Sequence, residues 1–176
     1  MFFRRWFQSH RGPELEFDTG DEEMVRALRA QALAMSPADA GMAQSAVHPM
    51  VWGMLMETAY PEAVATLFAI GDGTTSLYLS TGGGVIGAGA YVPVRVAAEA
   101  FVAAAEQHLD AFEPAFDAPP PPLGRVRFYA RTFDGTFTAE AGERELADAE
   151  HPLAPLYASG QALLTAVRHA ATGRTA

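Results

Sequence analysis

Three glycines, Gly82, Gly84 and Gly87, follow a predicted strand with the spacing G-x-G-x-x-G, and Gly83 lies between the first two. Backbone without side chains can approach a phosphate closely and offer its N–H groups as donors. The same glycines also suit a strand or bulge onto which another backbone packs. The glycine loop, residues 82–89, therefore predicts close packing first, and small-ligand or anion binding as the alternative.

A dinucleotide site is the least favoured interpretation of the glycine loop. The dinucleotide-binding motif needs a parallel strand–helix–strand unit, whereas the strand before this loop belongs to a predicted antiparallel hairpin. The next helix is expected to begin near Pro93, well beyond Gly87. The acidic residue that should end a second strand falls on that helix instead.

Arg125, Arg127 and Arg131 are two and four residues apart along one predicted strand, so their side chains share one face. Guanidinium groups bind carboxylates and phosphates through two parallel hydrogen bonds. This row could hold an anionic ligand, an acidic partner, or the chain's own acidic segment 140–150. A solvated strand face is the simpler expectation.

The remaining reactive residue types form no catalytic pattern. No serine lies in G-x-S-x-G, and no histidine pair has helical metal-ligand spacing. A metal site could assemble only in space, for instance from His48, His151 and Glu57. Glu57 itself is expected to face solvent or cap a turn, with acid–base chemistry as the alternative. We predict no catalytic residue, no metal ligand set and no cofactor.

Composition excludes several classes of function. The chain has 176 residues and no cysteine, which rules out disulfides, thiolate catalysis and cysteine-ligated metals. Its formal net charge of -9, from 12 basic and 21 acidic residues, disfavours nucleic acid as a partner. A cysteine-free chain needs no oxidising compartment, so we expect a cytoplasmic protein.

Residues 1–20 read as an aromatic and basic segment followed by a linker. Phe2, Phe3, Trp6 and Phe7 surround two arginines. This segment is expected to pack on its own domain or on another protein, and weak contact with a membrane interface is the less favoured alternative.

The first half of the chain predicts a helix and three strands. The helix covers residues 21–35, with Thr19 and Glu22 as a capping box. A strand over 51–58 precedes a hairpin of strands 64–70 and 75–80 around Asp72-Gly73, which favours a type I′ turn. That pairing would place Phe68 opposite Leu77 on an apolar face and leave a second face that is small but uncharged.

The second half predicts a helix, a hairpin and a final helix. The first helix covers residues 93–112 and leads into a stiff proline connector at 117–122. The hairpin covers 125–140 around Asp134-Gly135, again with a type I′ turn, and has one covered and one wet face. The last helix runs over 153–169, with a buried stripe at Leu156, Gly160, Leu163 and Val167.

The resulting order, α-β-β-β-α-β-β-α, predicts a single α+β domain over residues 21–170, with 171–176 as a tail. We expect a five-stranded, mainly antiparallel sheet with flanking helices. In architecture alone this arrangement resembles the profilin-like and roadblock-like class, and such a resemblance does not determine function.

The sequence favours a non-catalytic interaction or regulatory module that self-associates. The uncharged second face of the first hairpin and the aromatic N-terminus both call for a covering surface. The alternatives are a small-ligand or anion-binding domain that uses the glycine loop, with or without the arginine row, and an enzyme of unknown class.

Overall fold

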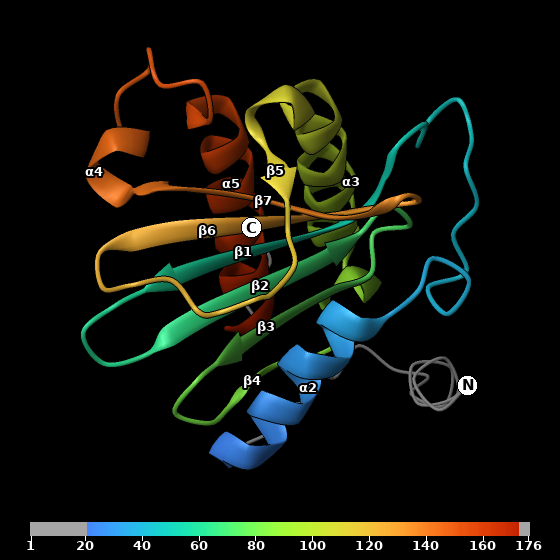
Figure 1. Cartoon of the computed structure of the whole chain (residues 1–176). Coiled ribbons are helices and arrows are strands. Elements are labelled where there is room, and N and C mark those ends of the chain that lie inside the picture. The colour runs from blue at the N-terminus through green and yellow to red at the C-terminus, as the bar shows by residue number, and fades with distance from the viewer. Residues whose placement is uncertain (1–20, 173–176) are drawn as a thin grey trace.

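The computed structural model describes residues 21–172, in which one seven-stranded sheet is covered by helices on both faces (Figure 1). The strand order is β4-β3-β2-β1-β6-β7-β5, and every neighbouring pair is antiparallel. The strands are β1 (Val51–Ala59), β2 (Val64–Ile70), β3 (Thr75–Leu79), β4 (Gly84–Val85), β5 (Glu113–Pro114), β6 (Arg125–Thr132) and β7 (Gly135–Gly142). The α+β class with flanking helices is confirmed.

The predicted number of five strands is wrong, because each edge of the sheet carries an additional two-residue strand. β4 lies inside the glycine loop, and β5 ends in Pro114. Two residues are too few to show the alternation that marks a strand, and glycine and proline are both depleted in strands.

Four α-helices lie in the described residues: α2 (Glu22–Ala34), α3 (Val92–Gln107), α4 (Glu143–Leu146) and α5 (Ala154–Ala171). α2 begins at Asp21, whose carboxylate accepts a hydrogen bond from the N–H of Met24 at 2.9 Å. The cap is therefore Asp21 and not the predicted Thr19, which lies outside the described residues with the rest of 1–20. α3 ends at Gln107, earlier than predicted, and a 3-10 turn over Leu109–Ala111 follows it.

The first hairpin is shifted by one residue from the predicted pairing. Leu67 lies opposite Leu77 and Phe68 opposite Ser76, so the loop contains the three residues Gly71, Asp72 and Gly73. Only Gly73 adopts a positive φ, of 88°, whereas a type I′ turn needs two such residues. A one-residue shift exchanges the two faces of one strand relative to the other. Leu77 and Phe68, which we expected to share a face, therefore lie on opposite faces.

The second hairpin confirms the predicted faces but not the predicted turn. Phe128 lies opposite Ala139 and Arg127 opposite Glu140, as the alternation indicates. Thr132 pairs with Gly135, and neither residue between them has a positive φ, so this turn is not type I′ either.

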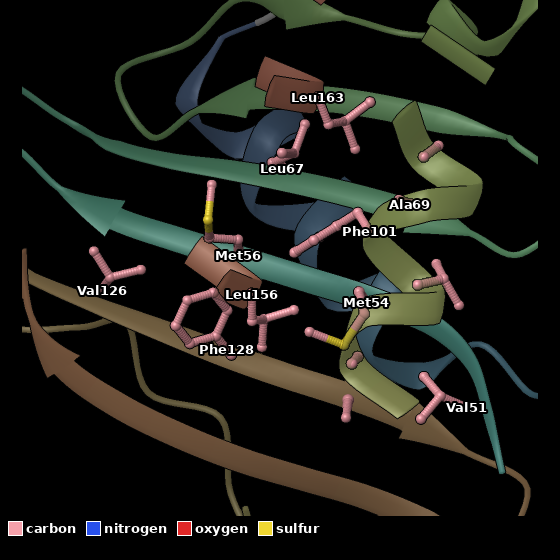
Figure 2. Packing of buried hydrophobic residues seen from close by; sticks show 14 of the residues in the cluster. Val51, Met54, Met56, Leu67, Ala69, Phe101, Val126, Phe128, Leu156 and Leu163 are labelled. Carbon is pink, nitrogen blue, oxygen red and sulfur yellow. The ribbon is translucent and has the colours of Figure 1, made fainter. Parts of the chain in front are cut away.

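The face covered by α3 and α5 holds the main apolar core. Met54 and Met56 of β1, Leu67 of β2 and Phe128 of β6 lie in one cluster with Phe101 of α3 (Figure 2), and the predicted stripe of α5 is buried as expected. α5 lies close to both the sheet and α3 at Gly160, where an added Cβ would lie 2.6 Å from the Met56 sulfur and 3.1 Å from Cε2 of Phe101. Buried apolar area on this face is the main source of stability for the sheet.

The opposite face is covered by α2 and by residues 115–124, which we call the proline strap. The strap leaves β5, crosses this face and leads into β6 (Figure 1). Beneath them lie Trp52, Leu55, Phe68 and Ile70. Both faces of the first hairpin are thus covered within the chain. The hairpin's uncharged face therefore no longer argues for a partner.

Candidate functional site

Glu57 is the one charged side chain that is fully buried among residues 21–172, with 0% of its surface exposed. It lies on the central strand β1, opposite Thr66 of β2 and Arg127 of β6. Its carboxylate accepts hydrogen bonds from Arg29 Nε at 2.6 Å, Arg29 Nη2 at 2.7 Å and Thr66 Oγ1 at 2.7 Å. The expectation that Glu57 faces solvent or caps a turn is wrong, because a partner on α2 compensates its burial.

Arg29 supplies that compensation and also contacts the proline strap. Its Nη2 donates a second hydrogen bond to the carbonyl of Ala118 at 2.8 Å. The hydrogen bonds that Arg29 donates to Glu57 raise the pKa of Arg29 above its ordinary value, so the guanidinium keeps its charge. A single guanidinium therefore joins α2, β1 and the strap.

Sequence reasoning missed Arg29, although two signals were available. Glu57 is the lone charge in the apolar run of β1. Arg29 lies four residues after Val25 and three before Ala32, the two buried positions of α2. A charge on the buried stripe of a helix needs a buried partner of opposite sign.

Two members of the predicted arginine row are bound to one carboxylate. Arg125 Nε donates to Glu140 Oε1 at 2.5 Å, and Arg127 Nη2 donates to Glu140 Oε2. Arg127 also donates to the carbonyl of Pro119 at 2.6 Å. The acidic segment that we considered as a partner for the row thus provides its ligand, through Glu140.

The third arginine, Arg131, binds the C-terminal end of α2. Its guanidinium donates to the carbonyls of Leu33 and Met35 and lies 5.4 Å from the centre of the Trp52 ring. Burial lowers the pKa of Arg131. The cation lies at the negative end of the helix dipole, where it stabilises α2. The predicted wet face is therefore wrong for this part of β6.

A hollow of about 290 Å³, which we call the strap hollow, opens between the proline strap and strands β6 and β7. Tyr129 of β6 joins the sheet to the strap at this hollow. Its hydroxyl donates a hydrogen bond to the carbonyl of Pro119 at 2.7 Å. Burial raises the pKa of Tyr129, so the hydroxyl keeps its proton. Its lining residues are Glu113, Asp117, Pro119, Arg127, Tyr129, Thr138, Ala139 and Glu140.

The charges of the strap hollow do not suit an anion. Glu140 is balanced by Arg125 and Arg127. Glu113 and Asp117 are exposed, and neither has an ion pair with any residue of 21–172. The surplus charge at the mouth of the hollow is therefore negative.

The glycine loop lies at the far edge of the sheet. An added Cβ on Gly84 would lie 2.3 Å from the Leu77 carbonyl oxygen, and one on Gly89 would lie 2.2 Å from the Gly73 carbonyl oxygen. Gly82, Gly83 and Gly87 have positive φ values of 101°, 83° and 73°. The packing interpretation of these glycines is confirmed, since the loop needs them for turns and for close backbone contacts.

Beside Gly83 and Gly84 lies a narrow apolar groove between α2 and the loop. Its lining is Met24, Val25, Leu28, Tyr78, Gly83, Gly84 and Ile86. The N–H of Gly82 is already donated to the Leu79 carbonyl, and the carbonyl of Gly83 accepts from Leu79. Almost no polar surface faces the groove. An anion bound through loop amides does not match this lining.

The glycine loop and the arginine row do not come together. β4 and β6 are separated by four strand spacings, or about 19 Å. No group of three or more metal-ligating residues is assembled anywhere in 21–172, and within the same residues no helix has the length and apolarity needed to cross a membrane.

The outward side of α3 forms a second candidate surface, for interaction and not for chemistry. Val92, Val96, Ala100 and Ala103 lie on one helical stripe and are all exposed, with Val92 and Val96 at 58% each. The stripe points away from the core positions of α3, which are Val94, Ala98, Phe101, Val102 and Ala105. We call the four exposed residues, Val92, Val96, Ala100 and Ala103, the outer stripe of α3.

α5 packs beside α3 and continues this surface. Its exposed positions include Pro155, Ala158, Ala162 and Thr165. The helix layer thus presents a broad outer face of small and apolar side chains, with Glu99 and Arg168 among the few charges on it.

Comparison with known proteins gives no assignment: no family model, no curated protein and no solved structure matches this chain.

Proposed function

We propose that the chain is a non-catalytic interaction module that self-associates through the outer face of α3 and α5. The observation that carries this proposal is the outer stripe of α3. A helix that is apolar on one side is typical of a two-layer domain, whereas a helix that is apolar on opposite sides is typical of one buried from both directions. α3 already fills the core with one side, so its other side calls for a second covering.

The charges of α3 strengthen this argument. Glu106 is used within the chain, because its carboxylate accepts hydrogen bonds from the N–H groups of Met50 and Val51. The Arg95 side chain lies over the turn at Gly73. The exposed charges of this 16-residue helix are therefore limited to Arg95 and Glu99.

The size of the face suits a modest homodimer. A 16-residue helix is about 24 Å long, and two helices side by side are about 20 Å wide. Each copy would bury on the order of 500 Å², so the total of about 1,000 Å² lies at the lower limit of specific interfaces. A two-fold axis across α3 would bring the same stripe of both copies together.

The profilin-like and roadblock-like architecture supports the same class of function only as an analogy. A sheet with helices on both faces, and no assembled group of metal-ligating residues in 21–172, is compatible with an interaction module. Function must still be argued from the surface itself, which here is the outer stripe of α3.

Sedimentation velocity over a concentration series tests the proposal. We expect the wild-type chain to show a reversible dimer and Val96→Glu to bind at least about ten-fold more weakly, because two carboxylates would be buried face to face. Val47→Glu is the matched control, since Val47 is 75% exposed and is not part of the outer stripe of α3. A wild-type chain that stays monomeric at every concentration would overturn the proposal.

A second arm separates this face from the aromatic N-terminus. A chain that lacks residues 1–12 should dimerise as well as the full chain. If the truncated chain is monomeric and Val96→Glu is still dimeric, the interface lies in the N-terminal segment and the assignment to α3 is wrong.

A further inference from the structure

The proline strap holds one large aromatic side chain fully in solvent. Phe116 is 98% exposed, the highest value among the exposed large apolar residues of 21–172. Its neighbours in the strap are not loose. The Ala118 carbonyl is bound by Arg29, and the Pro119 carbonyl is bound by both Arg127 and Tyr129. A phenyl ring held outward on an anchored backbone is preorganised for binding, since little entropy is lost when it is covered.

The charges around Phe116 specify what would cover it. Glu113 and Asp117 flank the ring in sequence and line the strap hollow. Pro114, Pro119 and Pro120 add exposed apolar surface around them. The strap thus carries an exposed aromatic ring and prolines next in sequence to two exposed carboxylates, and it suits a segment in which cations lie between aromatic side chains.

The chain itself contains such a segment outside the described residues. Phe2, Phe3, Arg4, Arg5, Trp6 and Phe7 place two adjacent arginines between two aromatic pairs. Elsewhere the chain is acidic, with a formal net charge of -9. The two arginines therefore complement Glu113 and Asp117 in sign and number.

The length of the intervening chain permits this contact on the same molecule. Residues 5 and 21 are joined by a chain that can extend to about 55 Å. Residues 21 and 29 are about 12 Å apart along the axis of α2. Since Arg29 contacts the strap directly, the strap lies well within reach of the segment.

We propose that residues 2–7 dock on the strap hollow of the same molecule, with Arg4 and Arg5 against Glu113 and Asp117 and the aromatic rings against Phe116 and the prolines. This contact uses the sheet face opposite the outer stripe of α3, so it does not depend on the proposed dimer. It assigns the aromatic segment to the chain's own surface and not to a membrane or another protein.

Tryptophan fluorescence quenching by acrylamide tests the contact in the full chain. The chain has two tryptophans, Trp6 and Trp52, and Trp52 is fully buried, so the quenchable emission reports Trp6. We expect Trp6 to be protected in the wild-type chain. The double charge reversals Glu113→Lys/Asp117→Lys and Arg4→Glu/Arg5→Glu should each weaken docking about ten-fold and expose Trp6.

The combination of both charge reversals should restore the protection, because it re-forms the two pairs with opposite signs. Glu62→Lys/Glu150→Lys is the control, since it changes the net charge equally at two other exposed carboxylates. Phe116→Ala should also expose Trp6, whereas Leu123→Ala, at a residue that is 68% exposed, should not. The unquenched emission of Trp52 shows that each variant is folded.

Three results would overturn the proposal. One is a Trp6 that is fully quenchable in the wild-type chain. Another is a pair of charge reversals that the combined variant does not rescue. The third is protection of Trp6 that disappears on dilution, which would place the segment on a second copy or another molecule instead.

Discussion

The two faces of the sheet are covered in different ways. On one face, α3 and α5 bury a continuous apolar cluster around Phe101, Met56 and Leu163. On the other, α2 buries only Val25 and Ala32, and the proline strap has no regular structure. The apolar cluster beneath this second cover is smaller, and contacts from Arg29, Arg127 and Arg131 also hold the cover in place.

The two covers of this sheet therefore depend on different kinds of interaction. Apolar packing is non-directional, and the stability that it provides falls in proportion to the apolar area that becomes exposed. A buried ion pair behaves differently. The loss of one partner is strongly destabilising, because it leaves the other charge buried and uncompensated. The second cover should therefore respond sharply to a single charge change, whereas the first should respond to lost volume.

The largest effect is expected on the apolar face. Phe101→Ala should lower the free energy of unfolding by about 4 kcal/mol, because it leaves a cavity where α3, α5 and β1 meet. Urea denaturation measures the change, and Val96→Ala on the outward side of α3 is the control, with little effect on the monomer. A loss below about 1 kcal/mol for Phe101→Ala would show that this face does not dominate stability.

A smaller but sharper effect is expected from Glu57→Gln on the face covered by α2 and the proline strap. We expect a loss of about 3 kcal/mol, because Arg29 keeps its charge without a carboxylate partner. Limited proteolysis should then cut near the end of α2 before the rest of the chain unfolds.

A double substitution separates the ion pair from simple packing. Glu57→Leu with Arg29→Met removes both charges, so most of the lost stability should return. If the double variant is as unstable as Glu57→Gln, the Arg29–Glu57 ion pair is not what holds α2, and the contrast between the two faces fails.

The smallest effect concerns Tyr78, which is buried beneath α2 without a hydrogen-bond partner for its hydroxyl. Burial raises the pKa of Tyr78 to about 12 from an ordinary value of 10.0. The unfolded chain therefore loses this proton at lower pH than the folded chain does. The contribution to stability is complete below pH 10 and falls between pH 10 and 12, by up to about 3 kcal/mol.

Tyr78→Phe should remove that part of the alkaline loss and should be neutral or slightly stabilising near pH 7, since no hydrogen bond is broken. Unfolding curves of both chains between pH 8 and about 12 give the comparison. Tyr60, Tyr129 and Tyr157, whose pKa values burial also raises, keep their share of the slope in both chains. An unchanged alkaline slope would mean that Tyr78 is hydrated in solution.

Periodicity predicts most of this fold and little of its polar site. The stripe of α5 and the faces of the second hairpin follow from alternation or helical spacing, which burial dictates residue by residue. The register of the first hairpin does not, because Asp72-Gly73 can be read as a two-residue or a three-residue loop, and both give plausible faces. Only the packing of Phe68 under α2 decides between them.

For Arg29, the sequence signals indicate that a buried partner is needed, but they do not identify that partner. Its partners lie 28 and 89 positions away, and no local pattern links a helix arginine to a strand glutamate or to a backbone carbonyl in a proline segment. The arginine row was found because its spacing is local. Its ligand, Glu140, follows from hairpin pairing across the turn.

The 89-residue separation between Arg29 and Ala118 also has a consequence in time. During synthesis α2 leaves the ribosome first, but the carbonyl that completes its anchoring is made roughly 4 to 18 s later at ordinary elongation rates. Until then α2 lacks this contact, although Glu57 and the residues of β2 and β3 beneath the helix are already made. α2 is thus synthesised early and completes its contacts late. In that interval its unfinished contact surface is accessible to a chaperone.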